Sequence, residues 1–128
     1  MKNIEILLVD DDPINNFVMN KVLTFKNGLD LKIYEYPEKA LEYIKDNKDR
    51  CEFLILLDLH MFLIDGWKFL IELDKNSLSS EVIIITSSDS KIDKQRASSN
   101  KRVIDYLVKP LGDEEIAYLK DKIEKMSI

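Results

Sequence analysis

Four apolar runs in this sequence are each followed by side chains that can bind a metal ion or take part in catalysis. In chain order these are Asp10, Asp11 and Asp12 after residues 4–9, Asp58 after residues 53–57, Thr86 after residues 82–85, and Lys109 after residues 103–108. Two carboxylates about 4 Å apart repel by roughly 4 kcal/mol at an effective dielectric constant of 20, and a hard divalent cation relieves that repulsion. Mg²⁺ suits an all-oxygen site that keeps some waters. A metal ion, a carboxylate nucleophile, a hydroxyl and a lysine form a set for phosphoryl transfer.

Each of these residues also has a structural explanation when it is taken alone. An Asp run after a strand is common in solvated loops, and Asp12 before Pro13 suits the N-cap of a helix. Thr86 begins a Thr-Ser-Ser segment that is typical of turns, and a lysine before a proline is usually a surface residue. These residue types at the ends of four strands together favour one shared functional site.

The pattern of apolar residues predicts five strand–helix units that would position these side chains. Strands are expected over residues 4–9, 29–34, 53–57, 82–85 and 103–108, with helices after Pro13, Pro37 and Gly66, over residues 90–100, and from Ile116 to Met126. The first helix is expected to end at Asn27-Gly28. Its evidence is a set of apolar residues that recur at helical spacing, which are Ile14, Phe17, Val18, Val22 and Phe25.

Alternating strands and helices predict an α/β fold, a five-stranded parallel sheet with helices on both faces. The first, third and fourth strands are apolar throughout, as interior parallel strands are. The second strand alternates and the fifth contains Asp105, so both suit the edges. The strand order 2-1-3-4-5 with right-handed crossovers satisfies these patterns. Ligands then bind beyond the carboxyl ends of the first and third strands, where Asp10 and Asp58 meet.

Length and composition exclude several other classes of protein. The 128 residues are expected to form one domain, 1–128, and 24 acidic against 19 basic residues give a net charge of −5. That charge disfavours nucleic acid and anionic membranes as partners. Three scattered glycines exclude a Gly-rich phosphate loop, and one His with one Cys excludes the usual zinc site. The lone Cys51 and the absence of a long apolar segment favour a buried thiol in a cytoplasmic protein.

Four motifs in the chain resemble those of response regulator receiver domains, the CheY-like family of two-component signalling. They are Leu8-Val9-Asp10-Asp11-Asp12-Pro13, Leu57-Asp58-Leu59-His60-Met61 with Asp65-Gly66 downstream, Ile85-Thr86-Ser87, and Tyr106-Leu107-Val108-Lys109-Pro110. The resemblance covers essentially the whole chain and implies a flavodoxin-like fold. It also implies a signalling domain that catalyses only its own phosphorylation and dephosphorylation, and not an enzyme with an external substrate.

The resemblance assigns roles around the acceptor and the metal ion. It implies that Asp58 takes a phosphoryl group from the phosphohistidine of a sensor histidine kinase or a histidine phosphotransfer protein. It implies an Mg²⁺ ion, for which Mn²⁺ can substitute, bound by Asp11 and Asp58 directly, by the backbone carbonyl of His60, and by Asp10 through a water.

The resemblance also implies a switch. Thr86 would move to bind the phosphoryl group, Lys109 would pair with another phosphoryl oxygen, and the rotamer of Tyr106 would follow Thr86. Pro110 corresponds to the cis-proline of the family, since only X-Pro bonds tolerate that conformation well. The movement would alter the face formed by the fourth helix, fifth strand and fifth helix.

Several positions depart from the usual pattern of the family. Phe62 stands where a proline is common, residues 99–101 replace a Gly-Ala pair, and His60 replaces a more common Asn. Because only the carbonyl of His60 is needed, metal binding is expected to persist. We hypothesise that His60 and Ser88 flank the approach of water and set the lifetime of the phosphoryl group, although a solvated loop explains His60 equally well.

Charge points to a candidate partner surface. Residues 91–102 contain five basic residues and one acid, a net +4, which leaves −9 for the rest of the chain. This segment is either a solvated helix face or a docking surface for an acidic partner. A downstream protein or a second copy is expected to bind through residues 91–108 and the last helix.

The sequence is interpreted as a single-domain response regulator, with three alternatives. It could be a receiver fragment of a hybrid histidine kinase, or a pseudo-receiver that acts as a scaffold without phosphorylation. It could also be an Mg²⁺-dependent phosphohydrolase, but such enzymes carry an acid/base Asp two residues after the nucleophile, and here that position is His60.

Overall fold

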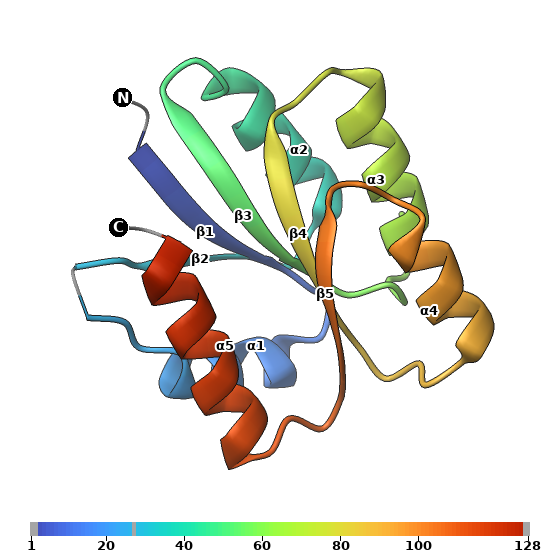
Figure 1. Ribbon diagram of the computed structural model, residues 1–128. Helices are drawn as coiled ribbons and strands as arrows, with labels where there is room; N and C mark the ends of the chain where they lie inside the picture. The colour runs from blue at the N-terminus through green and yellow to red at the C-terminus, as the bar shows by residue number, and fades with distance from the viewer. Residues whose placement is uncertain (1–2, 27, 127–128) are drawn as a thin grey trace.

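In the part of the chain that the computed structural model describes, residues 3–26 and 28–126, five strands alternate with five helices (Figure 1). In order they are β1 (Asn3–Val9), α1 (Pro13–Val22), β2 (Leu31–Tyr34), α2 (Pro37–Asp46), β3 (Cys51–Leu57), α3 (Gly66–Lys75), β4 (Ser80–Thr86), α4 (Lys91–Ser98), β5 (Val103–Val108) and α5 (Asp113–Met126). The predicted alternation of strands and helices is confirmed.

The strands form one parallel sheet in the order β2-β1-β3-β4-β5, which confirms the order expected from the sequence. The interior strands β1, β3 and β4 end in runs of fully buried residues, whereas every residue of the edge strands β2 and β5 is half-buried. The apolar runs therefore predicted which strands have both faces covered.

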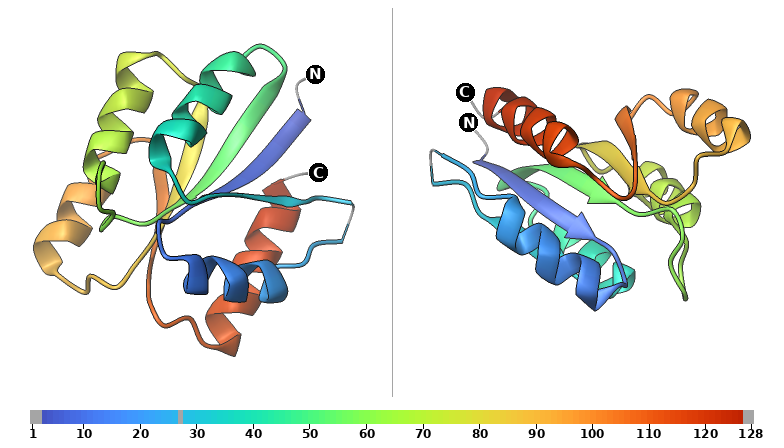
Figure 2. Two further views of the ribbon diagram at one scale, coloured as in Figure 1. Left: turned by 180° about the vertical axis from the view of Figure 1, so that it is seen from behind. Right: turned by 90° about the horizontal axis from the view of Figure 1, so that it is seen from below.

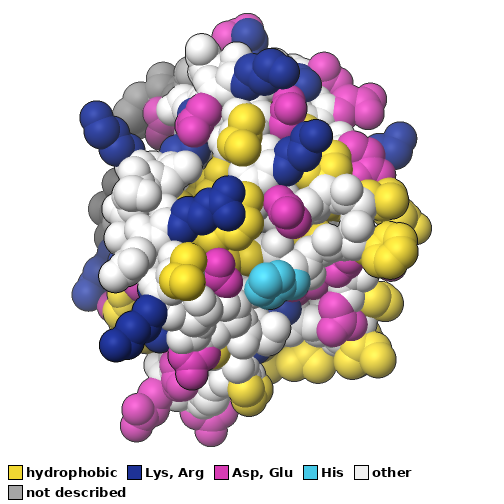
Figure 3. Space-filling model, turned by 90° about the vertical axis from the view of Figure 1, so that its right-hand side faces the viewer, with side chains coloured by type: hydrophobic (Ala, Val, Ile, Leu, Met, Phe, Trp, Pro, Cys, Tyr) yellow, Lys and Arg dark blue, Asp and Glu magenta, His cyan; other side chains and the backbone are white. Residues whose placement is uncertain are grey.

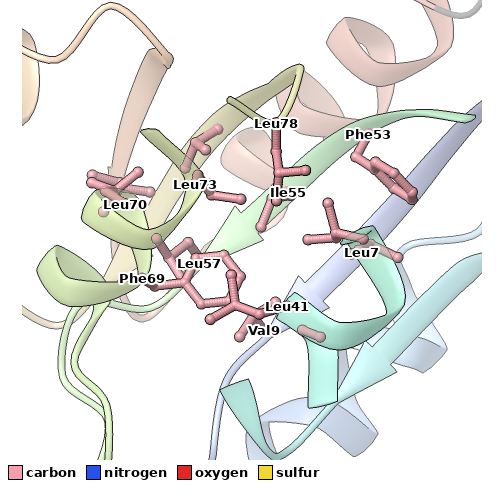
Figure 4. Packing of buried hydrophobic residues seen from close by; sticks show 14 of the residues in the cluster. Leu7, Val9, Leu41, Phe53, Ile55, Leu57, Phe69, Leu70, Leu73 and Leu78 are labelled. Carbon is pink, nitrogen blue, oxygen red and sulfur yellow. The ribbon is translucent and has the colours of Figure 1, made fainter. Parts of the chain in front are cut away.

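Helices cover both faces of the sheet (Figure 2). α1 and α5 pack on one face through Met19, Leu23, Leu119 and Ile123. α2, α3 and α4 lie on the other face, where apolar side chains of the helices meet those of β1 and β3 (Figure 4). Cys51 is buried in this second cluster, as predicted, and burial raises the pKa of its thiol.

The apolar residues that recur at helical spacing do not form the buried face of α1. Ile14 and Phe17 are 76% and 65% exposed, Val18 and Val22 are also exposed, and α1 ends at Val22. The side chains that face the sheet are instead Asn16, Met19 and Leu23.

Polar contacts at the start of α1 explain why its apolar side chains face outward. The Asp12 carboxylate caps the helix by accepting the N–H of Ile14 at 3.0 Å, and the Asn16 side chain donates to the Asp10 carbonyl at 2.8 Å. These bonds turn Asn16 inward and the apolar stripe outward. The helix was expected to end at Asn27-Gly28, and this is wrong, because α1 already ends at Val22. Gly28 lies beyond the helix with φ of +72°, and Asn27 lies outside the described residues.

Candidate functional site

The carboxyl ends of the interior strands bring the predicted residues to one edge of the sheet. Asp58 donates its N–H to the Val9 carbonyl at 3.1 Å, which places it beside Asp10. On the other side of β3, Lys109 donates its N–H to the Thr86 carbonyl at 2.7 Å. Residues from four strands therefore converge where the strand order reverses, as expected for this type of sheet.

Three carboxylates lie together at this edge. One oxygen from each of Asp10, Asp11 and Asp58 lies within 4.8 Å of the others, and Asp10 is only 1% exposed. Asp58 is also buried, whereas Asp11 is half-exposed. A half-open set of carboxylate oxygens is what a hard cation such as Mg²⁺ requires when it keeps part of its water shell.

Asp10 is held from three directions. Its Oδ1 accepts the N–H of Asp12 at 3.0 Å, and its Oδ2 accepts Asn15 Nδ2 at 2.8 Å and Lys109 Nζ at 2.6 Å. Burial raises the pKa of Asp10, the charge of Asp58 acts in the same direction, and the bonds from Lys109 and Asp12 offset these effects only in part. The charged form of Asp10 is therefore disfavoured on balance.

Lys109 bridges the two buried acids. Its Nζ lies 2.6 Å from Asp10 Oδ2 and 3.3 Å from Asp58 Oδ2. Burial alone lowers the pKa of Lys109, but the bond to Asp10 and the charges of both acids outweigh it, so that the pKa is raised. The ammonium therefore stays protonated beside Asp58. The Lys109–Pro110 peptide bond is cis.

The loop between β3 and α3 contacts two of the three carboxylates, those of Asp58 and Asp11. His60 donates its N–H to Asp58 Oδ1 at 3.2 Å, and Phe62 donates its N–H to Asp11 Oδ2 at 2.6 Å. A proline at position 62 could not make the second bond, because it has no N–H. The departure at Phe62 therefore adds a direct tie between this loop and the acidic group.

Thr86 and Tyr106 are connected through a third residue, Ser88. The buried Thr86 accepts the Ser88 N–H on Oγ1 at 3.3 Å, and the Tyr106 hydroxyl donates to the Ser88 carbonyl at 2.9 Å. Across residues 3–26 and 28–126, no hydrogen bond joins the Thr86 hydroxyl to Asp58. The two predicted switch residues are thus linked by the main chain of Ser88.

The two residues hypothesised to set the phosphoryl lifetime both face a carboxylate on α4. Ser88 Oγ donates to Asp93 Oδ2 at 2.5 Å, and the exposed His60 has its Nε2 4.0 Å from the same oxygen. The Ser88 hydroxyl is therefore directed to α4.

Sequence reasoning missed three residues of this region: Asn15, Asn16 and Asp93. Asn15 binds the Asp10 side chain and Asn16 binds its carbonyl, so the first turn of α1 supports the buried acid. The only signal in the sequence was a pair of adjacent asparagines near the start of the helix, where asparagine is common without such a role. Asp93 is the single acid in the basic segment, but nothing in its spacing indicates that it contacts Ser88.

The basic segment has several intramolecular contacts. Arg102 lies 2.7 Å from Asp74 and also donates to three main-chain carbonyls, and Arg96 stacks on Trp67 with 4.3 Å between the guanidinium carbon and the ring centroid. Lys94 lies 3.7 Å from Asp89. Figure 3 shows basic side chains gathered around an apolar area on this side of the molecule. Arg102 is therefore a structural residue, and docking by the remaining basic residues stays a prediction.

Comparison with known proteins identifies the family. A family model of the response regulator receiver domain matches residues 6–119. This chain belongs to the response regulator receiver domain family. The resemblance predicted from the four motifs is confirmed, and receiver domains are components of two-component signalling. In the part of this receiver domain that the structure describes, no helix is both long and apolar enough to cross a membrane.

Curated relatives of this receiver domain come from plants and bacteria. It is 29% identical over 113 residues to the two-component response regulator ARR14 of Arabidopsis thaliana, covering 88% of this chain and 29% of the relative. It is 27% identical over 125 residues to the probable C4-dicarboxylate response regulator DctR of Bacillus subtilis, covering 97% of this chain and 54% of the relative. The chain thus spans about half or less of the length of these relatives.

Solved structures show the same fold over almost the whole chain. A two-component response regulator from Legionella pneumophila is 25% identical, with a TM-score of 0.78 and coverage of 97% of this chain and 99% of that one. The receiver domain of the Francisella response regulator 1452 is 28% identical, with a TM-score of 0.74 and coverage of 97% and 98%. The CheY-like architecture predicted for this receiver domain is therefore confirmed.

Proposed function

We propose that this receiver domain is a phosphorylation-controlled switch in which Asp58 accepts a phosphoryl group from a phosphohistidine. The donor is a sensor histidine kinase or a histidine phosphotransfer protein. The observation that carries this proposal is the convergence of Asp10, Asp11 and Asp58 around the ammonium of Lys109. Such a site combines a carboxylate nucleophile with a fixed positive charge beside it.

The reaction follows from the position of these groups. A carboxylate oxygen of Asp58 attacks phosphorus in line with the leaving imidazole nitrogen, the P–N bond breaks, and its electron pair stays on that nitrogen. Lys109, already 3.3 Å from Asp58 Oδ2, pairs with a phosphoryl oxygen. Asp11, Asp58 and the carbonyl of His60 would hold Mg²⁺ or Mn²⁺ directly, and Asp10 through a water. When bound, the metal ion supplies positive charge that neutralises phosphoryl oxygens.

The switch uses the connection between Thr86 and Tyr106. When the Thr86 hydroxyl turns to donate to the new phosphoryl oxygens, its contact with the Ser88 N–H is expected to change. The Tyr106 hydroxyl, bonded to the Ser88 carbonyl, follows this change. The face formed by α4, β5 and α5 then presents a different surface to a downstream protein or a second copy of the domain.

The exposed stripe of α1 suits contact with the phosphodonor. Ile14 and Val18 line a groove beside Lys109 and Pro110, on the helix that begins directly after the acidic run. Contiguous exposed apolar side chains mark interaction surfaces. A protein that delivers a phosphohistidine to Asp58 would contact this part of α1. Replacing Ile14 by serine is therefore expected to weaken that contact and to leave phosphorylation by small-molecule donors unchanged.

Phosphorylation by acetyl phosphate tests the proposal without a cognate kinase. Intact-protein mass spectrometry is expected to show one added phosphoryl group on the wild-type protein with Mg²⁺, and none with EDTA. Asp58→Asn is expected to abolish the addition, whereas Asp89→Asn, a change at an exposed acid on the β4–α4 loop, is expected to leave it intact.

Other outcomes separate the alternatives. No addition to the wild-type protein would favour a phosphorylation-independent scaffold. Steady hydrolysis of an external phosphate ester would favour a phosphohydrolase. Addition to Asp58→Asn would mean that the acceptor is another residue.

A further inference from the structure

Asp93 joins the two loops that flank the site to the first turn of α4. Its carboxylate accepts the Ser88 hydroxyl at 2.5 Å and lies 4.0 Å from His60 Nε2, and its side chain is 22% exposed. We propose that Asp93 is a positioning residue, which holds the β4–α4 loop in its unphosphorylated conformation through Ser88 and so slows phosphorylation of Asp58. This inference rests on the proposed function of Asp58.

Ser88 is the point where the contacts of this loop meet. Its N–H bonds to Thr86 Oγ1, its carbonyl accepts the Tyr106 hydroxyl, and its own hydroxyl bonds to Asp93. Ser88 Oγ also accepts the N–H of Ser90, the N-cap residue of α4, with 3.4 Å between the oxygen and the nitrogen. Every polar group of Ser88 is therefore engaged.

The contact with Asp93 is the strongest of these bonds by type and length. A hydroxyl bonded to a carboxylate at 2.5–2.7 Å is charge-assisted and about twice as strong as a bond between neutral groups. The bond from Ser88 N–H to Thr86, at 3.3 Å, is long and neutral. Asp93 thus anchors Ser88, and the Ser88 N–H in turn occupies one acceptor position of the Thr86 hydroxyl oxygen.

A population argument gives the direction of the effect. If the domain must release Ser88 before Thr86 can bind the phosphoryl group, any bond that exists only before release lowers the fraction of competent molecules. Removing the Ser88–Asp93 bond is therefore expected to raise the initial rate of phosphorylation by about 3- to 10-fold, the fold-change that corresponds to the net contribution of one partly exposed hydrogen bond. It is also expected to loosen α4, because Asp93 lies in its first turn.

A double-mutant cycle tests this proposal. Asp93→Ala and Ser88→Ala remove opposite ends of the same bond, so each is expected to raise the rate with acetyl phosphate, and the double variant is expected to exceed neither. Ser88→Ala leaves the sequence of α4 intact, which separates the bond from any effect of Asp93 on helix stability. Asp89→Ala is the matched control, since this neighbouring exposed acid lies 3.7 Å from Lys94 and, in the part of the chain that the structure describes, makes no hydrogen bond to Ser88, so it is expected to retain the wild-type rate.

A second measurement needs no phosphorylation. Trp67 is the single tryptophan and stacks under Arg96 of α4, so its fluorescence reports the packing of α4 against α3. Both single variants are expected to shift this fluorescence and to speed amide hydrogen exchange in residues 88–98, while Asp89→Ala does neither.

The outcomes are distinguishable. Unchanged or slower phosphorylation in both single variants, or effects that multiply in the double variant, would overturn the role of Asp93. If the wild-type protein takes up no phosphoryl group, the proposed function fails instead, and fluorescence and hydrogen exchange then decide the loop contact. Wild-type values in both of those measurements would overturn it.

Discussion

β1 carries a carboxylate near each end, and the two are treated in opposite ways. Near the amino end, Glu5 belongs to a group that we call the Glu5 cluster, which consists of Glu5, Lys32, Tyr43 and Arg50. Beyond the carboxyl end, Asp10 belongs to the acidic site, which consists of Asp10, Asp11, Asp58 and Lys109. The first group has two cations for one acid, and the second has one cation for three acids.

The pKa values of Glu5 and Asp10 are shifted in opposite directions. Burial raises the pKa of Glu5, but hydrogen bonds from Tyr43 at 2.5 Å and Lys32 at 3.3 Å outweigh it, so that the pKa is lowered. In Asp10, burial prevails over the bond from Lys109, and the pKa is raised. The charged form of Glu5 is thus favoured by its partners, whereas the charged form of Asp10 is disfavoured by its burial.

The ratio of cations to acids separates the Glu5 cluster, which is structural, from the acidic site, for which we propose a function. The Glu5 cluster ties β1, β2 and α2 together and needs nothing further to be satisfied. The acidic site keeps carboxylates that a divalent cation can neutralise, at the edge of the sheet where ligands bind. Three carboxylates with one cation therefore distinguish the acidic site, for which we propose a function, from the Glu5 cluster at the other end of the strand.

The largest effect is expected from removing the lysine of each group. In EDTA, Lys109→Met leaves Asp10 and Asp58 buried without a cation, and breaking such a pair costs about 3 kcal/mol of unfolding free energy. Lys32→Met is the matched control: Lys32 is 42% exposed against 18% for Lys109, and Arg50 remains near Glu5, so the expected loss is about 0.5 kcal/mol. Urea unfolding measures both. Equal losses of unfolding free energy would mean that removing the lysine costs no more in the acidic site than in the Glu5 cluster.

Magnesium is expected to have the second largest effect, and only at one end. Mg²⁺ at about a hundredfold excess over its Kd would stabilise the folded protein by about 2.7 kcal/mol, visible as a rise in Tm over the EDTA sample. Asp11→Asn is expected to remove most of that rise, since it deletes a carboxylate of the acidic site. Glu5→Gln is expected to retain it. A Tm that is insensitive to Mg²⁺ in the wild-type protein would contradict the metal site.

The fold was predictable because burial decides both strand type and strand order. Long apolar runs identified β1, β3 and β4 as interior strands, and alternation or Asp105 identified the edges. The acidic site was predictable for a related reason: residues that follow parallel strands share one edge, so Asp10, Asp58 and Lys109 needed no knowledge of the helices.

The helix contacts were not predictable in this way. The face of α1 depends on how Asp12 caps the helix and on the bond from Asn16 to the Asp10 carbonyl, and apolar periodicity contains neither. Asp93 reaches Ser88 only because α4 begins where it does after the loop. Polar contacts that orient helices therefore lie beyond a reading of apolar patterns, and these contacts connect the site to the rest of the domain.

The smallest effect is a pH dependence of opposite sign at the two ends of β1. Because the pKa of Glu5 is lowered in the folded protein, its contribution to stability is present above the ordinary pKa of a glutamate, about 4.3, and is lost as the pH falls below it. Because the pKa of Asp10 is raised, its ionisation costs stability as the pH rises above about 3.9 in the metal-free protein.

Two amide variants measure these slopes by urea unfolding in EDTA across the acidic range. Glu5→Gln is expected to be less stable than the wild-type protein at pH 7, by no more than about 1 kcal/mol, with the difference vanishing toward low pH. Asp10→Asn imitates the neutral acid, so its stability relative to the wild-type protein is expected to fall as the pH falls. Slopes of the same sign in both variants would mean that ionisation does not stabilise the fold at Glu5 and destabilise it at Asp10.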